Sequence, residues 1–112
     1  MTRRIFHLIP VPIIPTTQGL NGAVARSFWF KVHIRPDAMG DEALIQHELE
    51  HCRQAWRLPV LHVLLYRISR RYRLWAEISA HRVQVAYGMS IVAARRSLWE
   101  MYGVEVSEEE LA

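Results

Sequence analysis

The chain has 112 residues, of which 51% are hydrophobic and 22% are charged, and its formal net charge is +3 at pH 7. This length and composition exclude a disordered chain and predict one domain, residues 1–112, with a small core. The small positive charge is compatible with an acidic partner but does not establish nucleic-acid binding.

The cysteine content and the apolar segments indicate the compartment. Cys52 is the only cysteine, which excludes an intrachain disulfide and favours a reducing environment. The N-terminal apolar stretch is interrupted by Pro10, Pro12 and Pro15, so it does not match a secretory signal. The longest apolar run near the middle, residues 60–66, is far shorter than a membrane span. We therefore expect a cytoplasmic protein without a membrane span, in which Cys52 is a buried thiol.

Short strands are predicted in the first third of the chain. Residues 5–14 are apolar with recurring prolines, which predicts a short strand that continues into an extended, edge-like segment. Gly19, Asn21 and Gly22 predict a loop over residues 16–22. Residues 28–34 carry the strongest strand pattern, because two kinds of side chain alternate along them. The alternation predicts an inner face of Phe28, Phe30, Val32 and Ile34 and an outer face of Trp29, Lys31 and His33.

A long helix is predicted next. Asp41 is a good N-cap, and Pro59 ends the helix after about Arg57. Apolar residues recur at helical spacing and form one stripe, which we expect to pack on the core. This stripe consists of Ile45, Leu49, Cys52 and Trp56.

The remainder of the chain predicts further helices. Residues 60–87 have a helical pattern with a break or kink near 69–72, and Ser90 caps a helix over 91–102. Ser107 and Glu110 have the spacing of a capping box on a final short turn. Strands followed by helices indicate the α+β class.

The segment 47–51 carries the main chemical signal, because it reads His-Glu-x-x-His. On a helix, His47 and His51 lie on one face at positions i and i+4, so both imidazoles can reach one tetrahedral metal ion. Glu48 lies about 100° further round the helix. We expect Glu48 to be unburied and to hold a metal-bound water. The pattern predicts a zinc site; the alternative is a solvated helix.

A catalytic zinc site needs a third protein ligand. The metzincin arrangement is excluded, because Gln54 and Arg57 stand where it requires glycine and histidine. Residues 53–96 contain nine arginines and a single acidic residue, Glu77, which makes Glu77 the candidate ligand. The alternative for Glu77 is an ion pair with Arg73, four residues earlier.

The two motifs together resemble a known family. His47-Glu48-Leu49-Glu50-His51 and Glu77-Ile78-Ser79-Ala80-His81 resemble the two-helix core of the gluzincin metallopeptidases, in particular the very small minigluzincins and related bacterial or phage proteins. The resemblance covers about residues 28–87. It implies a zincin-like α+β fold with short N-terminal strands or a hairpin, an active-site helix, a second ligand-bearing helix and a C-terminal helix.

The same resemblance implies a site and a reaction. One zinc ion per chain would bind to His47, His51 and Glu77, and Glu48 would be the general base. Zinc would lower the pKa of a bound water towards about 7 and polarise a peptide carbonyl. Glu48 would accept the water proton and pass it to the leaving amine. The expected substrate is a peptide or a protein.

His81 departs from the family pattern, which usually has aspartate at this position. We rank first a supporting role, in which neutral His81 accepts the distal N–H of a zinc-bound histidine. His81 would otherwise ligate the metal itself, or donate a hydrogen bond to the developing oxyanion. Tyr72 and Tyr87 are the other candidates for the oxyanion donor.

Substrate binding is expected at the strand over residues 28–34. An extended peptide would pair with its free edge around Trp29, Lys31 and His33.

Two other functions are compatible with the sequence. One is a zinc-stabilised binding module without turnover. The other is nucleic-acid binding through arginines, for which a solvated basic face is the simpler interpretation. These arginines are Arg67, Arg70, Arg71, Arg73 and Arg82. The sequence does not indicate an oligomeric state.

Overall fold

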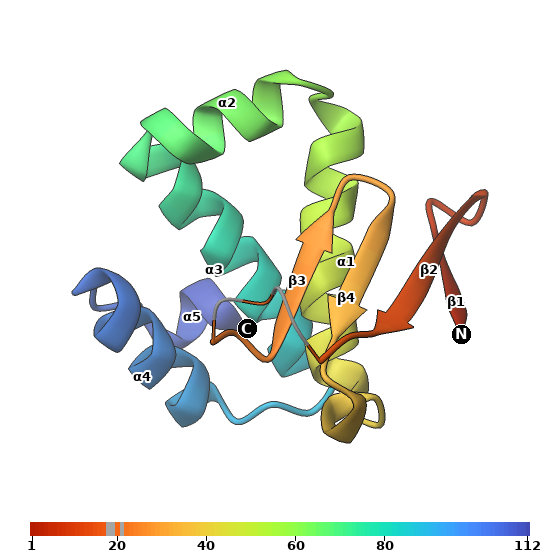
Figure 1. Ribbon diagram of the computed structural model, residues 1–112. Helices are drawn as coiled ribbons and strands as arrows, with labels where there is room; N and C mark the ends of the chain where they lie inside the picture. Colours follow the sequence, from red (N-terminus) through yellow and green to blue (C-terminus); the bar gives the residue numbers. More distant parts are fainter. Residues whose placement is uncertain (18–19, 21) are drawn as a thin grey trace.

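Strands precede helices along the chain, as the α+β prediction requires (Figure 1). The computed structural model describes residues 1–17, 20 and 22–112, so residues 18, 19 and 21 of the predicted loop 16–22 lie outside the described residues. The strands are β1 (Thr2–Ile5), β2 (Ile9–Pro15), β3 (Ala25–Phe28) and β4 (Lys31–Ile34). The helices are α1 (Glu42–Arg57), α2 (Leu61–Ile68), α3 (Arg70–Ala86), α4 (Ile91–Tyr102) and α5 (Glu108–Leu111), with a 3₁₀ turn at Pro36–Ala38.

The N-terminal segment is a hairpin rather than one strand with an extended continuation. β1 and β2 are antiparallel, and the turn between them contains Phe6 and His7 at positive φ. The prolines of β2 are tolerated because of their register. Ile13 donates its N–H towards β1, to the carbonyl of Met1. N–H directions alternate along a strand, so Pro10 and Pro12 occupy positions whose N–H would point away from β1.

The prediction of one continuous strand over residues 28–34 is wrong. Trp29 and Phe30 form a turn, and the chain reverses there so that β3 and β4 pair with Phe28 opposite Lys31. The alternating pattern continues through this two-residue turn, so periodicity alone does not reveal it. The inner face is correct for Val32 and Ile34, which are fully buried.

The positions of the aromatic residues follow from this turn. Phe28 and Phe30 are exposed rather than packed on the helices, and the Lys31 ammonium lies 5.3 and 5.6 Å from the centres of their rings. The sheet order is β1-β2-β4-β3, so Lys31 and His33 lie on a strand that pairs on both sides. Among the described strands, the edge near the helices that has no pairing partner is therefore β3, not the segment around Lys31 and His33.

α1 forms as predicted, because its cap and its apolar stripe agree. The Asp41 carboxylate accepts a hydrogen bond from the Leu44 N–H, 3.1 Å long, at the first turn. Ile45, Leu49 and Cys52 are buried against the sheet, and Trp56 packs on the edge of this core. The Cys52 thiol donates to the Phe28 carbonyl oxygen at 3.1 Å. Burial raises the pKa of this thiol to about 12, so it stays protonated.

The helical region after Pro59 is broken where the sequence predicts it. Ser69 is both the C-cap of α2 and the N-cap of α3. At the start of α3 its hydroxyl accepts a hydrogen bond from the Tyr72 N–H. The predicted bounds of α4 are correct, with Ser90 at its start and Gly103 at φ 66 at its end. Ser107 caps α5 in the predicted capping box. α3 packs beside α1, the β3–β4 hairpin packs on α1, and α2 joins the ends of α1 and α3 (Figure 1).

Among the described residues, every helix is too short or too polar to cross a membrane.

Candidate metal centre

Two helices bring the three predicted ligands together. α1 carries His47 and His51, and α3 carries Glu77; each of the three is buried. His51 Nε2 lies 3.0 Å from Glu77 Oε1, and His47 Nε2 lies 3.5 Å from Glu77 Oε2. All three potential ligand atoms lie within 4.8 Å of one another. This group can hold a metal ion.

Two glutamines orient the imidazoles. Gln84 Oε1 lies 2.8 Å from His47 Nδ1, and Gln54 Oε1 lies 3.0 Å from His51 Nδ1. The Gln54 amide nitrogen donates to the Ala76 carbonyl at 3.0 Å, so the amide oxygen faces His51. An amide oxygen only accepts, so Nδ1 carries the hydrogen in the neutral form of each histidine, and Nε2 is the atom left to bind a metal ion.

These glutamines were not predicted as site residues. In the sequence, Gln54 is notable only as a mismatch to the metzincin pattern. Its position three residues after His51 was the available signal, because such residues are neighbours on a helix surface. Gln84 gives no such local signal, since it lies 37 residues from His47.

A tyrosine from α2 also reaches the centre. The Tyr66 hydroxyl donates to Glu77 Oε1 at 2.6 Å. Burial, together with the nearby Glu77 carboxylate, raises the pKa of Tyr66, so the hydroxyl remains a donor. Tyr72 instead lies with its hydroxyl 2.7 Å from His62 Nδ1, and Tyr87 is exposed. The structure therefore places Tyr66, rather than either predicted tyrosine, against a ligand.

The electrostatics of the centre show strong coupling between His51 and Glu77. Burial lowers the pKa of His51, but its hydrogen bond and attraction to Glu77 outweigh burial and raise that pKa to about 9. Burial raises the pKa of Glu77, but its bonds with His47 and His51 outweigh burial and lower it. Without a metal ion, the centre thus holds an imidazolium beside a carboxylate. A divalent cation suits the same place. Its charge compensates the negative charge of the Glu77 carboxylate after His51 loses its proton.

Glu48 lies beside the centre but is not one of the converging ligands. It is 7% exposed, so the expectation of an unburied side chain is wrong; the helix turns it partly towards the core. Its charge nevertheless acts on His51, whose pKa it helps to raise. Within residues 1–17, 20 and 22–112, no hydrogen bond or ion pair engages the Glu48 carboxylate. The carboxylate is therefore available to a bound molecule.

His81 is buried in the same region but does not support a ligand in the predicted way. Its Nδ1 lies 2.7 Å from the Glu77 carbonyl oxygen and its Nε2 lies 3.3 Å from Ser97 Oγ. Its ring packs edge-on against His47, at 4.7 Å between ring centres. The distal N–H of His47 is taken by Gln84, so His81 is not its acceptor. Burial is the main cause of a lowered pKa, which keeps His81 neutral.

The ion-pair alternative for Glu77 is not the arrangement found. Arg73 donates instead to two backbone carbonyls, of Tyr66 at 2.9 Å and of Arg67 at 3.2 Å. It thereby holds the end of α2 against α3. The Glu77 carboxylate instead meets His47, His51 and Tyr66, and His81 Nδ1 lies 3.9 Å from its Oε2.

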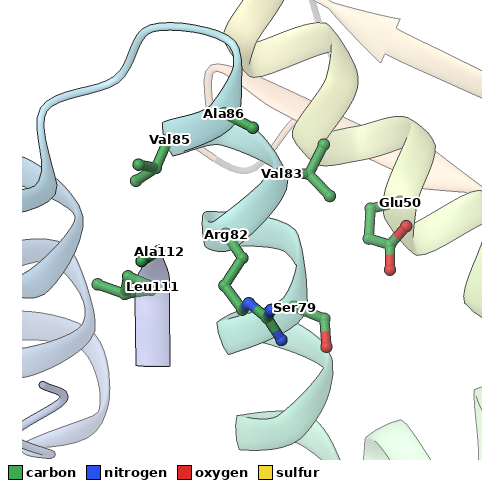
Figure 2. Close-up of a pocket in the computed structure, with 8 residues that line it drawn as sticks. All are labelled: Glu50, Ser79, Arg82, Val83, Val85, Ala86, Leu111 and Ala112. Carbon is green, nitrogen blue, oxygen red and sulfur yellow. The ribbon is translucent and has the colours of Figure 1, made fainter. Parts of the chain in front are cut away.

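A pocket of about 370 Å³ lies elsewhere on α3 (Figure 2). Ser79, Arg82 and Val83 line it from α3, with Glu50 of α1 on one side and the C-terminal residues on the other. At about 100° per residue, the α3 residues of this pocket lie opposite Glu77. The pocket is therefore separate from the metal centre.

No family model, no curated protein and no solved structure matches the chain. The resemblance to gluzincins thus rests on the motif residues alone.

Proposed function

We propose that the protein is a zinc-dependent metallopeptidase of the gluzincin type. The observation that carries this proposal is the convergence of two imidazole Nε2 atoms and one carboxylate within 4.8 Å, with a second, unengaged carboxylate beside them. A structural site requires only the first group. The second carboxylate, on Glu48, is what a hydrolytic site adds.

The donor set supports zinc as the metal. Two nitrogens and one carboxylate oxygen are common donors for catalytic zinc, which keeps a further position open. When bound, zinc would supply a Lewis acid and lower the pKa of water. The glutamine acceptors at each Nδ1 support this assignment, since zinc-binding histidines usually donate their other N–H.

The chain's own groups have distinct roles in the proposed reaction. Glu48 accepts a proton from the attacking water and delivers it to the leaving amine. Tyr66 keeps the Glu77 carboxylate in place through its 2.6 Å hydrogen bond. β3 offers its outer edge to an extended substrate, because within the described residues it pairs only with β4, and it packs on α1.

The test compares Glu48→Gln with the wild type. Both proteins are stripped with a chelator, reloaded with one equivalent of zinc and assayed on a mixed peptide library. We expect equal zinc content by elemental analysis and a loss of cleavage of at least about 10²-fold in Glu48→Gln, because the base is removed and the shape is kept. Glu50→Gln is the matched control, since Glu50 lies on the same helix and pairs with Arg53 at 3.1 Å.

A zinc-stabilised binding module is the second candidate, because the buried ligands link α1 to α3. In that case the wild type cleaves no peptide, and Glu48→Gln raises the metal-loaded stability by removing a buried charge without a partner.

A further inference from the structure

The outward face of α2 is apolar and uncovered. All eight residues of this helix are at least partly exposed, although six of them are aliphatic or aromatic. Leu61, Leu64 and Ile68 are 46%, 52% and 71% exposed. With Val63, they cover about 160° of the helix at 100° per residue. Contiguous exposed apolar surface of this kind marks an interaction site.

The opposite face of α2 is already occupied. Tyr66 bonds Glu77, and the His62 ring lies against Tyr72. α2 is therefore held against α3 in a defined orientation, which directs its apolar face away from the protein. Figure 1 shows α2 at one extremity of the molecule, bridging the ends of α1 and α3. The apolar face, formed by Leu61, Val63, Leu64 and Ile68, thus protrudes, and we call it the ridge.

The chain segment that contains α2 carries charge of one sign. Residues 52–76 contain six arginines and no acidic residue. Arg67 lies within the apolar face of α2, and Arg71 lies in the first turn of α3, just after the break at Ser69; both are exposed. In the part of the chain that the structure describes, neither side chain makes a hydrogen bond or an ion pair. A long arginine side chain can extend past apolar neighbours and place its guanidinium at a polar boundary.

We propose that α2 binds the surface of an anionic lipid bilayer. The helix lies in the plane of the interface, with Leu61, Leu64 and Ile68 at the acyl boundary. Arg67 and Arg71 meet the lipid phosphates. Apolar residues combined with arginines are characteristic of interfacial helices, and both contributions add to binding.

Charge and composition favour this occupant over the others. A second copy docking through the same face would bring arginines against arginines, which opposes a two-fold interface. Protein hot spots are enriched in tryptophan and tyrosine, whereas leucine and valine are under-represented. The ridge consists mainly of Leu, Val and Ile, and the bilayer needs no complementary groove.

The test measures cosedimentation of the full chain with vesicles. One set contains phosphatidylcholine alone, and the other contains about 30% phosphatidylglycerol to supply negative surface charge. We expect binding to the anionic vesicles, much weaker binding to the neutral ones, and release at about 0.5 M salt. Leu64→Asp should reduce the partition coefficient at least about tenfold, because it places a charge at the acyl boundary. Arg67→Gln should reduce it about fivefold.

Val92→Asp is the matched control, because Val92 is 64% exposed on α4 and lies outside the ridge. Circular dichroism checks that each variant keeps its helices. Equal binding of Leu64→Asp and Val92→Asp would overturn the proposal, as would failure of the wild type to bind anionic vesicles. Self-association that Leu64→Asp abolishes, without vesicle binding, would assign the face to a second copy instead.

Discussion

Replacing Gln54 with methionine should weaken both the fold and the metal centre, because one amide serves both. Gln54 is 1% exposed, accepts from His51 Nδ1 at 3.0 Å and donates to the Ala76 carbonyl at 3.0 Å. Methionine has a similar length and can occupy the same space, but it can neither donate this bond nor accept it well. The substitution therefore leaves the buried His51 N–H unsatisfied and removes the second bond to the Ala76 carbonyl, which keeps its intrahelical bond within α3.

The magnitude follows from these two groups. The unsatisfied His51 N–H costs about 1–3 kcal/mol, the lost bond to Ala76 costs about 0.5–1.5 kcal/mol, and the buried thioether returns about 1 kcal/mol. We expect Gln54→Met to lower the free energy of unfolding of the metal-free protein by about 0.5–3.5 kcal/mol. Zinc affinity should fall about 10–100-fold, because the His51 ring loses the acceptor that orients it.

Two measurements separate these effects. Urea unfolding of the chelator-treated protein gives the stability, and competition with a chromophoric chelator gives the zinc affinity of the folded protein. Gln46→Met is the control, since Gln46 is also buried on α1 but only accepts a 3.4 Å bond from Arg53. It should cost less than about 1 kcal/mol and leave zinc affinity unchanged. Wild-type zinc affinity in Gln54→Met would refute the orienting role.

Three further outcomes are expected. The raised pKa of His51 stabilises the metal-free protein fully below its ordinary value of 6.5, and this contribution is lost as pH rises through about 9. Urea unfolding without metal should therefore show a loss of up to about 3 kcal/mol across that window, and a flat profile would contradict the His51–Glu77 pair. In the β3–β4 register, Phe28 and Lys31 form the hydrogen-bonded closing pair, so the Ser27 N–H points to the free edge. If substrate pairs there, Ser27→Pro should raise KM severalfold with zinc retained, whereas an unchanged KM would exclude this edge. Tyr66→Phe removes the 2.6 Å bond to Glu77 and should lower zinc affinity about tenfold; competition titration showing no change would leave Tyr66 without a role at the ligand.

Features that depend on neighbouring residues could be predicted from the sequence alone. Asp41, Ser90 and Ser107 each cap a helix where the sequence predicts a start, because a cap depends on residues within one turn. The buried stripe of α1 and the pair His47 and His51 depend only on helical spacing. The break at Ser69 could also be predicted, because Ser69 caps α3 through residues within one turn.

The prediction of one strand over residues 28–34 was wrong, because the local pattern fits two structures, a continuous strand and a hairpin. Alternation over residues 28–34 is the same whether the chain continues or reverses at Trp29 and Phe30. Pairing of β4 with both β2 and β3 decides between them, and that pairing joins segments far apart in sequence. The free edge consequently belongs to β3, which lies before the predicted edge residues.

The sequence by itself determined the helix that carries His47 and His51 and singled out Glu77 as the one acidic candidate among the arginines. Only the tertiary structure decided that Gln84 faces His47, that Tyr66 faces Glu77, and that His81 turns to a backbone carbonyl. The physical reason is the range of the interactions. Spacing along one helix places side chains on a face, but contacts between helices depend on how α1, α2 and α3 pack, and that packing is a property of the whole chain.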